Sequence, residues 1–306
     1  ALLAPLALLV TGSLPGADAD PHRRARWAQV SAGFGLALAV AVAVSVALLG
    51  RQVTPTLGML GAGVGLYVDA ISTTIFLLVS FVGMVVVRFS RNYLDGDPRH
   101  GTFVQRLCLT IASVQLVVLA GNMAMLLAAW IATSLFLNQL LQFYPTRRGA
   151  ILAARKKFVV SRLGDLCLLA AALLLFHAFG AFDYATILAA ASAHTGTSSA
   201  SITLASLLIA CAALLKSAQF PLHGWILEVM ETPTPVSALL HAGIINAGGF
   251  LVLRFAELMV LSPSAMQLLA VVGGLTALFG SLVMMTQTSI KVSLAYSTVA
   301  QMGDPG

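Results

Sequence analysis

The sequence predicts an all-α polytopic membrane protein. Of its 306 residues, 59% are hydrophobic and only 9% are charged, against roughly 25% charged residues in an ordinary soluble domain. Apolar runs long enough to cross a bilayer recur along the whole chain. The net charge of +6 comes from basic residues in the short loops between these runs, as membrane topology requires. It therefore does not indicate nucleic-acid binding.

The apolar runs predict helices in order along the chain. They cover residues 1–14, 27–49, 66–90, 103–120, 122–143, 156–179, 202–226, 236–260 and 264–287, and a further helix begins near residue 289. The helix over 202–226 is expected to break near Pro221, because proline cannot donate a backbone hydrogen bond. Residues 51–65 contain one proline, Pro55, between two threonines, and four glycines, which predict irregular or hairpin structure.

The basic residues predict the orientation. With the N-terminus outside, eleven of them fall in inner loops: Arg23, Arg24, Arg26, Arg88, Arg91, Arg99, Arg147, Arg148, Arg155, Lys156 and Lys157. The outer loops contain Arg51 and little else. Since lysine and arginine concentrate in cytoplasmic loops, we expect a multi-pass protein with its N-terminus outside.

Three titratable residues on three spans are expected at a similar depth. Measured from the inner face, Asp165 lies about 12 Å, Lys216 about 10 Å and His241 about 8 Å into the membrane. A lysine is costly in lipid and so faces the protein interior or a water path, and histidine titrates near neutral pH. The shared depth predicts a proton relay. A Lys216 that snorkels to the interface and a His241 that only braces helices are the structural alternatives.

Three further residues are candidates for supporting or gating roles. Arg162 precedes Asp165 by three residues on one helix face, and the two either neutralise each other or join the relay. His223 follows the break and either gates the inner exit or bonds to freed carbonyls. Lys291 is either a relay group of the next unit or an interface anchor.

The sequence shows no catalytic set and no metal site. Cys108, Cys167 and Cys211 lie inside apolar runs without metal-ligand spacing, which is typical of small core residues. We therefore expect no cofactor in this chain.

Four motifs resemble the proton-conducting membrane transporter family. They are the segments Lys216 to Trp225 (KSAQFPLHGW), Glu231 to His241 (ETPTPVSALLH), Phe158 to Asp165 (FVVSRLGD) and Ile290 to Thr298 (IKVSLAYST). The family includes subunit L or 5 of complex I, the Mrp-type antiporters and the DabB subunit of inorganic carbon transporters.

The resemblance implies an antiporter-like helical bundle of about fourteen helices built on two inverted repeats, each with a broken helix. This chain is then a fragment of that fold. Residues 1–100 would hold the N-terminal transmembrane helices one to three, 101–260 the first antiporter-like repeat, and 261–306 the start of the second.

The resemblance also assigns roles to residues. Lys216 is implied to be the broken-helix lysine, His241 the following relay histidine, and Arg162 with Asp165 the pair of the sixth span. Complex I and Mrp subunits carry a glutamate after a tryptophan in the fifth span, but here Ile131 follows Trp130. We therefore expect Asp165 to be the carboxylate partner of Lys216.

The segments at residues 92–98, 128–135 and 154–158 are similar to DabB-type sequences. This similarity implies a transporter subunit rather than an enzyme. It would conduct a cation, H⁺, and so energise a large DabA-like partner subunit that captures CO₂ as bicarbonate at a zinc site of its own. The alternatives are a proton-pumping subunit L of NADH–quinone oxidoreductase, an Mrp-type Na⁺/H⁺ antiporter subunit, or a non-conducting anchor.

Overall fold

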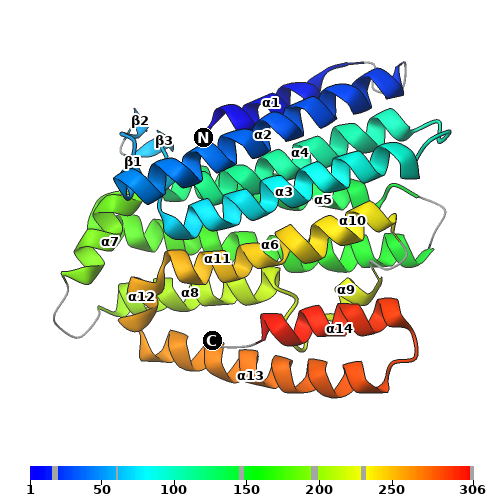
Figure 1. The fold of residues 1–306 in the computed structure, drawn as a ribbon. Coiled ribbons are helices and arrows are strands. Elements are labelled where there is room, and N and C mark those ends of the chain that lie inside the picture. The colour runs from blue at the N-terminus through cyan, green and yellow to red at the C-terminus, as the bar shows by residue number, and fades with distance from the viewer. Residues whose placement is uncertain (16–19, 60, 145–147, 194–198, 229–231, 304–306) are drawn as a thin grey trace.

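The protein is a bundle of long helices that run side by side, with two small hairpins at one end (Figure 1). The computed structural model describes residues 1–15, 20–59, 61–144, 148–193, 199–228 and 232–303. Over these ranges, six helices are long and apolar enough to cross a membrane. The predicted all-α multi-pass fold is therefore confirmed. Arg147 and Glu231, used in the sequence analysis, lie outside the described residues.

The helices follow the predicted order closely. They are α1 (Leu3–Ser13), α2 (Pro21–Leu49), α3 (Ala70–Tyr93), α4 (His100–Leu119), α5 (Met123–Leu141), α6 (Arg148–Phe179), α7 (Tyr184–Ser192), α8 (Ala200–Lys216), α9 (Gly224–Glu228), α10 (Thr234–Leu239), the π-helical turn η2 (Leu240–Ile244), α11 (Asn246–Arg254), α12 (Ala256–Val260), α13 (Pro263–Thr286) and α14 (Ile290–Met302). The predicted break separates α8 from α9, and the helix expected over 236–260 is the series from α10 to α12. The short helix α7 lies where the sequence predicted only an outer loop.

Side-chain caps explain where two helices begin. Helix α2 begins at residue 21 rather than at 27, because Asp20 accepts a hydrogen bond from the Arg23 amide at 3.1 Å and Pro21 follows it. Helix α3 begins at residue 70 rather than at 66, because Asp69 and Ser72 cap each other reciprocally. Caps override hydrophobic periodicity at both positions.

The segment before α3 forms two antiparallel hairpin pairs. Strand β1 (Gln52–Val53) pairs with β4 (Tyr67–Val68), and β2 (Leu57–Met59) pairs with β3 (Ala62–Val64). Gly58 lies opposite Gly63, and a Cβ at Gly58 would lie 1.8 Å from the Ala62 carbonyl oxygen. Only glycine fits there, so the predicted hairpin structure is confirmed with a physical reason.

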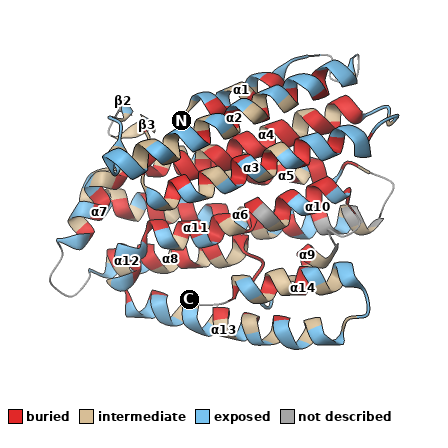
Figure 2. Ribbon diagram, in the orientation of Figure 1, coloured by how far each residue is buried: buried red, intermediate tan, exposed pale blue. Residues whose placement is uncertain are grey.

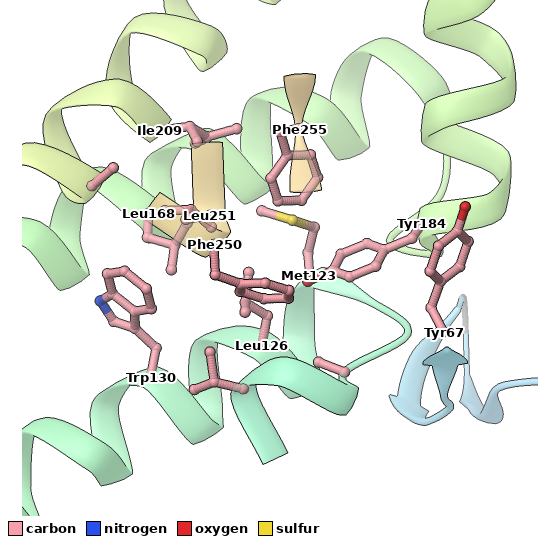
Figure 3. Packing of buried hydrophobic residues seen from close by; sticks show 14 of the residues in the cluster. Tyr67, Met123, Leu126, Trp130, Leu168, Tyr184, Ile209, Phe250, Leu251 and Phe255 are labelled. Atoms are coloured by element: carbon pink, nitrogen blue, oxygen red, sulfur yellow. The ribbon is translucent and has the colours of Figure 1, made fainter. Parts of the chain in front are cut away.

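The core lies between the helices that surround α4 and α5. Helix α4 is buried along most of its length, whereas α2 and α13 expose most of their apolar surface (Figure 2). Figure 3 shows a packed row of side chains that begins at Trp130 on α5, passes Phe250 and Met123, and ends at Tyr184 and Tyr67. This row joins the hairpin end of the bundle to the Trp130 ring, which lies against Lys216.

Candidate functional site

Helix α8 ends at Lys216 because the following residues cannot continue it. The Ser217 hydroxyl donates to the Ala213 carbonyl oxygen at 2.9 Å, and Ala218 adopts a left-handed φ of 53°. Pro221 then removes a backbone donor. The lysine therefore sits at the last turn of a helix that stops inside the bundle.

The last two helices hold the break in place. The Phe220 amide donates to Thr276 Oγ1 on α13 at 3.0 Å, and the Gln219 side chain donates from Nε2 to the Met302 carbonyl oxygen on α14 at 2.7 Å. Irregular backbone at membrane depth is tolerated only where protein or water satisfies its polar groups. Helix α13 meets that requirement at the Phe220 amide, and the Gln219 side chain ties the break to α14.

The Lys216 side chain crosses to α5. Its Nζ donates to Ser134 Oγ at 2.9 Å and to the Trp130 carbonyl oxygen at 3.4 Å, and it lies 4.3 Å from the centroid of the Trp130 ring. Lys216 is only 7% exposed, so the snorkelling alternative is wrong. A cation over an aromatic face is attracted by the ring quadrupole. Ile131 on α5 has no carboxylate to pair with the ammonium. Trp130 and Ser134 hold the ammonium instead.

Helix α6 brings the other charges to this place. Arg162 and Asp165 form an ion pair at 2.7 Å, and Asp165 is buried. The charges of Lys216, Arg162 and Lys157 all act on the Asp165 carboxylate. Neither carboxylate oxygen accepts a hydrogen bond from any described residue. Asp165 is therefore coupled to Lys216 electrostatically, while its direct contact is with Arg162.

The structure adds one group that the sequence analysis missed. Lys157, placed in an inner loop by the charge pattern, lies within α6, is 3% exposed, and donates from Nζ to the Ser134 carbonyl oxygen at 3.0 Å. The sequence spacing could have revealed this lysine. Lys157, Ser161 and Asp165 are four residues apart and therefore share one helix face. We call Lys157, Arg162, Asp165, Lys216 and Ser134 the buried cluster.

The other predicted residues lie outside the buried cluster. His241 is in η2 and interacts electrostatically with Lys291 on α14. The His223 ring packs against Phe279, with ring centroids 4.9 Å apart, and against Phe220 and Tyr296. The Nδ1 atoms of both histidines are buried and have no hydrogen-bond partner within the described ranges. His223 thus lies among aromatic rings of α13 and α14, and His241 lies within electrostatic range of Lys291 on α14.

The described side chains include no group of three or more histidine, cysteine, aspartate and glutamate residues that could hold a metal ion. The titratable groups of the buried cluster are amines, a guanidinium and one carboxylate. The two amines and the carboxylate can exchange protons, whereas the guanidinium stays charged.

The end of the bundle that carries the hairpins holds a separate ion pair. Arg254 at the end of α11 donates to both oxygens of Asp69 at the start of α3, at 2.7 and 3.1 Å. Tyr67 and Phe250 face its guanidinium at 4.7 and 5.2 Å from their ring centroids. This pair fastens α11 to α3 and is structural.

Several membrane-spanning helices, a broken helix and a buried lysine at the break define an antiporter-like transport subunit. Residues 120–304 match the family described as NADH:quinone oxidoreductase/Mrp antiporter, TM, and residues 55–104 match the complex I chain 5 N-terminus. The chain therefore belongs to the NADH:quinone oxidoreductase/Mrp antiporter family.

Curated relatives include inorganic carbon transporter and complex I subunits. The chain is 43% identical over 282 residues to the probable inorganic carbon transporter subunit DabB of Hydrogenovibrio crunogenus, covering 92% of this chain and 54% of that protein. It is 38% identical to NADH-quinone oxidoreductase subunit L of Mycobacterium tuberculosis, covering 80% of this chain and 38% of that protein. The chain thus spans about half the length of the DabB relative.

A solved structure shows the same fold. The Mrp complex from Dietzia sp. DQ12-45-1b superposes with a TM-score of 0.81 and 31% identity, covering 98% of this chain and 33% of the matched chain.

Proposed function

We propose that the chain is part of a membrane subunit that conducts a cation, H⁺, through a path containing Lys216. The observation that carries this proposal is the burial of the Lys216 ammonium at a helix break, where it is electrostatically coupled to Asp165. A buried ionisable group at such a break is typical of a proton or ion path. His241 and Lys291, with His223 at the break, extend the path toward α14.

In this proposal, the proton-conducting subunit is part of an inorganic carbon transporter of the DabA–DabB type. Support comes from the 43% identity to a DabB subunit, against 38% to a subunit L. In this proposal the proton gradient energises a large DabA-like partner, which captures CO₂ as bicarbonate at its own zinc site. The membrane is the bacterial inner membrane, with the N-terminus outside.

A second candidate is a proton-pumping subunit L of NADH–quinone oxidoreductase or an Mrp-type Na⁺/H⁺ antiporter subunit. The superposition on the Mrp complex over 98% of this chain favours it. Against it stands Ile131, because α5 supplies no carboxylate to Lys216.

Purification of the full-length protein from its native membrane distinguishes the two candidates. We expect one large partner subunit and bound zinc in the purified complex, identified by mass spectrometry and metal analysis. Many redox subunits with iron–sulfur clusters, or a set of antiporter subunits without zinc, would overturn the inorganic-carbon proposal.

Conduction itself is tested in vesicles. The full-length complex is reconstituted, a membrane potential is imposed, and proton entry is followed with an internal pH dye. We expect Lys216→Met to lower proton flux about a hundredfold, since proton transfer through a positioned group contributes at least that much. Undiminished flux in Lys216→Met would exclude Lys216 from the path.

A further inference from the structure

Two lysine side chains from different helices converge on one serine. Lys157 from α6 donates to the Ser134 carbonyl oxygen at 3.0 Å, and Lys216 from α8 donates to the Ser134 hydroxyl at 2.9 Å. Both lysines are more than nine-tenths buried. Both ammonium groups are therefore largely withdrawn from the surface of the bundle.

The charges around this serine do not balance. With every group ionised, the cluster carries three positive charges (Lys157, Lys216 and Arg162) and the single negative charge of Asp165. Asp165 makes its direct ion pair with Arg162, which stays charged in proteins. Helix α5 adds Trp130 and Ser134 to the site but no charge. Among the described side chains, two ammonium groups therefore face one shared acceptor residue without a hydrogen-bonded carboxylate of their own.

Within the five described residues of the buried cluster, the two lysines are the groups that can remove this excess by losing a proton. An uncompensated buried charge is expensive, and lysine loses its proton readily when buried, whereas arginine does not. Both amines contact Ser134, so a single excess proton can charge either of them.

We propose that Lys157 and Lys216 share one proton, and that Lys157 is a second proton-carrying group of the path. In each exchange an N–H bond breaks at one Nζ and forms at the other, so the charge of the pair is unchanged. Helix α5 carries Ile131 and gives Lys216 no titratable partner. Lys157 on α6 takes that place. The transport role of Lys157 rests on the proposed proton conduction through Lys216. The sharing of a proton between the two lysines does not depend on it.

The sharing is measured without any transport assay. The full-length protein, labelled with ¹⁵N-lysine in lipid bilayers, is examined by solid-state NMR at neutral pH, with Lys157→Met and Lys216→Met assigning the two Nζ signals. In the unmodified protein, we expect the two Nζ signals to report one positive charge in total, shared between the two nitrogens. In Lys157→Met, we expect the Nζ signal of Lys216 to be that of a fully protonated ammonium. Two full ammonium groups in the unmodified protein would overturn the proposal.

The transport role is measured in the same vesicles with a matched set of variants. We expect Lys157→Met and Lys157→Arg to lower proton flux by about a hundredfold alike, because neither side chain exchanges a proton. Lys156→Met, which changes the exposed neighbouring lysine, should keep its flux. Full flux in Lys157→Arg would show that Lys157 only donates a structural hydrogen bond. If the unmodified protein conducts no protons, the proposed function fails while the NMR result still decides the sharing.

Discussion

Single residues decide how the buried cluster differs from an ordinary lysine–carboxylate pair. The Lys216 ammonium is held by the Trp130 ring and the Ser134 hydroxyl, with Asp165 acting at longer range. A cation–π contact and a hydroxyl stabilise the charge less than a direct carboxylate does. The balance between charged and neutral Lys216 is therefore sensitive to small changes nearby.

The coupling between Asp165 and Lys216 is testable with a double-mutant cycle. We expect Asp165→Asn and Lys216→Met to be non-additive in the free energy of unfolding by at least about 0.5 kcal/mol, because charges in one cluster interact. The measurement is thermal unfolding of the four proteins in detergent. Asp69→Asn combined with Lys216→Met is the control and should be additive. Additivity at Asp165 would leave Lys216 without a carboxylate partner.

The Asp69–Arg254 pair predicts a pH dependence of stability. Burial acts to raise the pKa of Asp69, but hydrogen bonds from Arg254 and Ser72 and the Arg254 charge outweigh it, and the pKa lies below its ordinary value. A lowered folded-state pKa contributes stability that is present above the unfolded pKa of about 3.9 and lost as pH falls through the folded value.

Asp69→Asn isolates this contribution, since asparagine keeps the helix cap. We expect the variant to be less stable by about 3 kcal/mol at pH 7, because Arg254 is left buried without its partner. The difference from the unmodified protein should stay constant down to pH 5 and shrink below about pH 4. Melting temperatures of both proteins across this range are the measurement, and a difference that grows with acidity would contradict it.

The close packing of α11 against α8 depends on one glycine of the Gly248–Gly249 pair. A Cβ at Gly248 on α11 would lie 2.0 Å from Ser217 Oγ and 2.6 Å from the Ala213 carbonyl oxygen, whereas one at Gly249 meets nothing within 4 Å. We expect Gly248→Ala to cost about 1 to 3 kcal/mol by overpacking, and Gly249→Ala to cost less. Chemical unfolding of the two variants side by side is the test, and equal costs would refute the close α8–α11 contact.

The break between α8 and α9 depends on a hydroxyl from α13. Thr276, which is fully buried, accepts from the Phe220 amide at 3.0 Å. We expect Thr276→Val to cost about 1 to 3 kcal/mol, because a buried amide is left unsatisfied. Thr298→Val, at an exposed site on α14, is the matched control. Faster amide exchange at Phe220 in the first variant alone would confirm that α13 holds the break.

The whole molecule has two chemically different ends. The hairpins, α7 and the Asp69–Arg254 pair lie at one end of the bundle, and the loops joining α3 to α4 and α13 to α14 lie at the other (Figure 1). The exposed apolar surfaces of α2 and α13 lie along the sides between them (Figure 2). This arrangement fits a bundle that crosses a bilayer along its long axis.

The proposed orientation is tested by labelling intact cells. We expect a cysteine at Pro55, in the exposed hairpin segment, to react with a membrane-impermeant maleimide from outside. A cysteine at Pro98, exposed between α3 and α4, should react only after the membrane is opened. Both are made in a cysteine-free background. The reverse pattern would place the N-terminus inside.

The sequence by itself determined the spans, the break at Pro221 and the Arg162–Asp165 pair. These features follow from local rules: apolar length, proline's missing donor and the three-residue spacing of a helix face. An apolar segment that ends in a lysine also singled out Lys216, and the motif resemblance added the family. Both the family and the burial of Lys216 are confirmed. The relay roles of His241, His223 and Lys291 stay predictions.

Only the tertiary structure decided which charges meet. Lys157 and Lys216 are far apart in sequence, and their convergence on Ser134 depends on how α5, α6 and α8 pack. The same holds for Arg254 with Asp69, and for Gly248 rather than Gly249 at the α8 contact. Periodicity tells which residues share a helix face, but the rotation of each helix against its neighbours is set by the packing of the whole core.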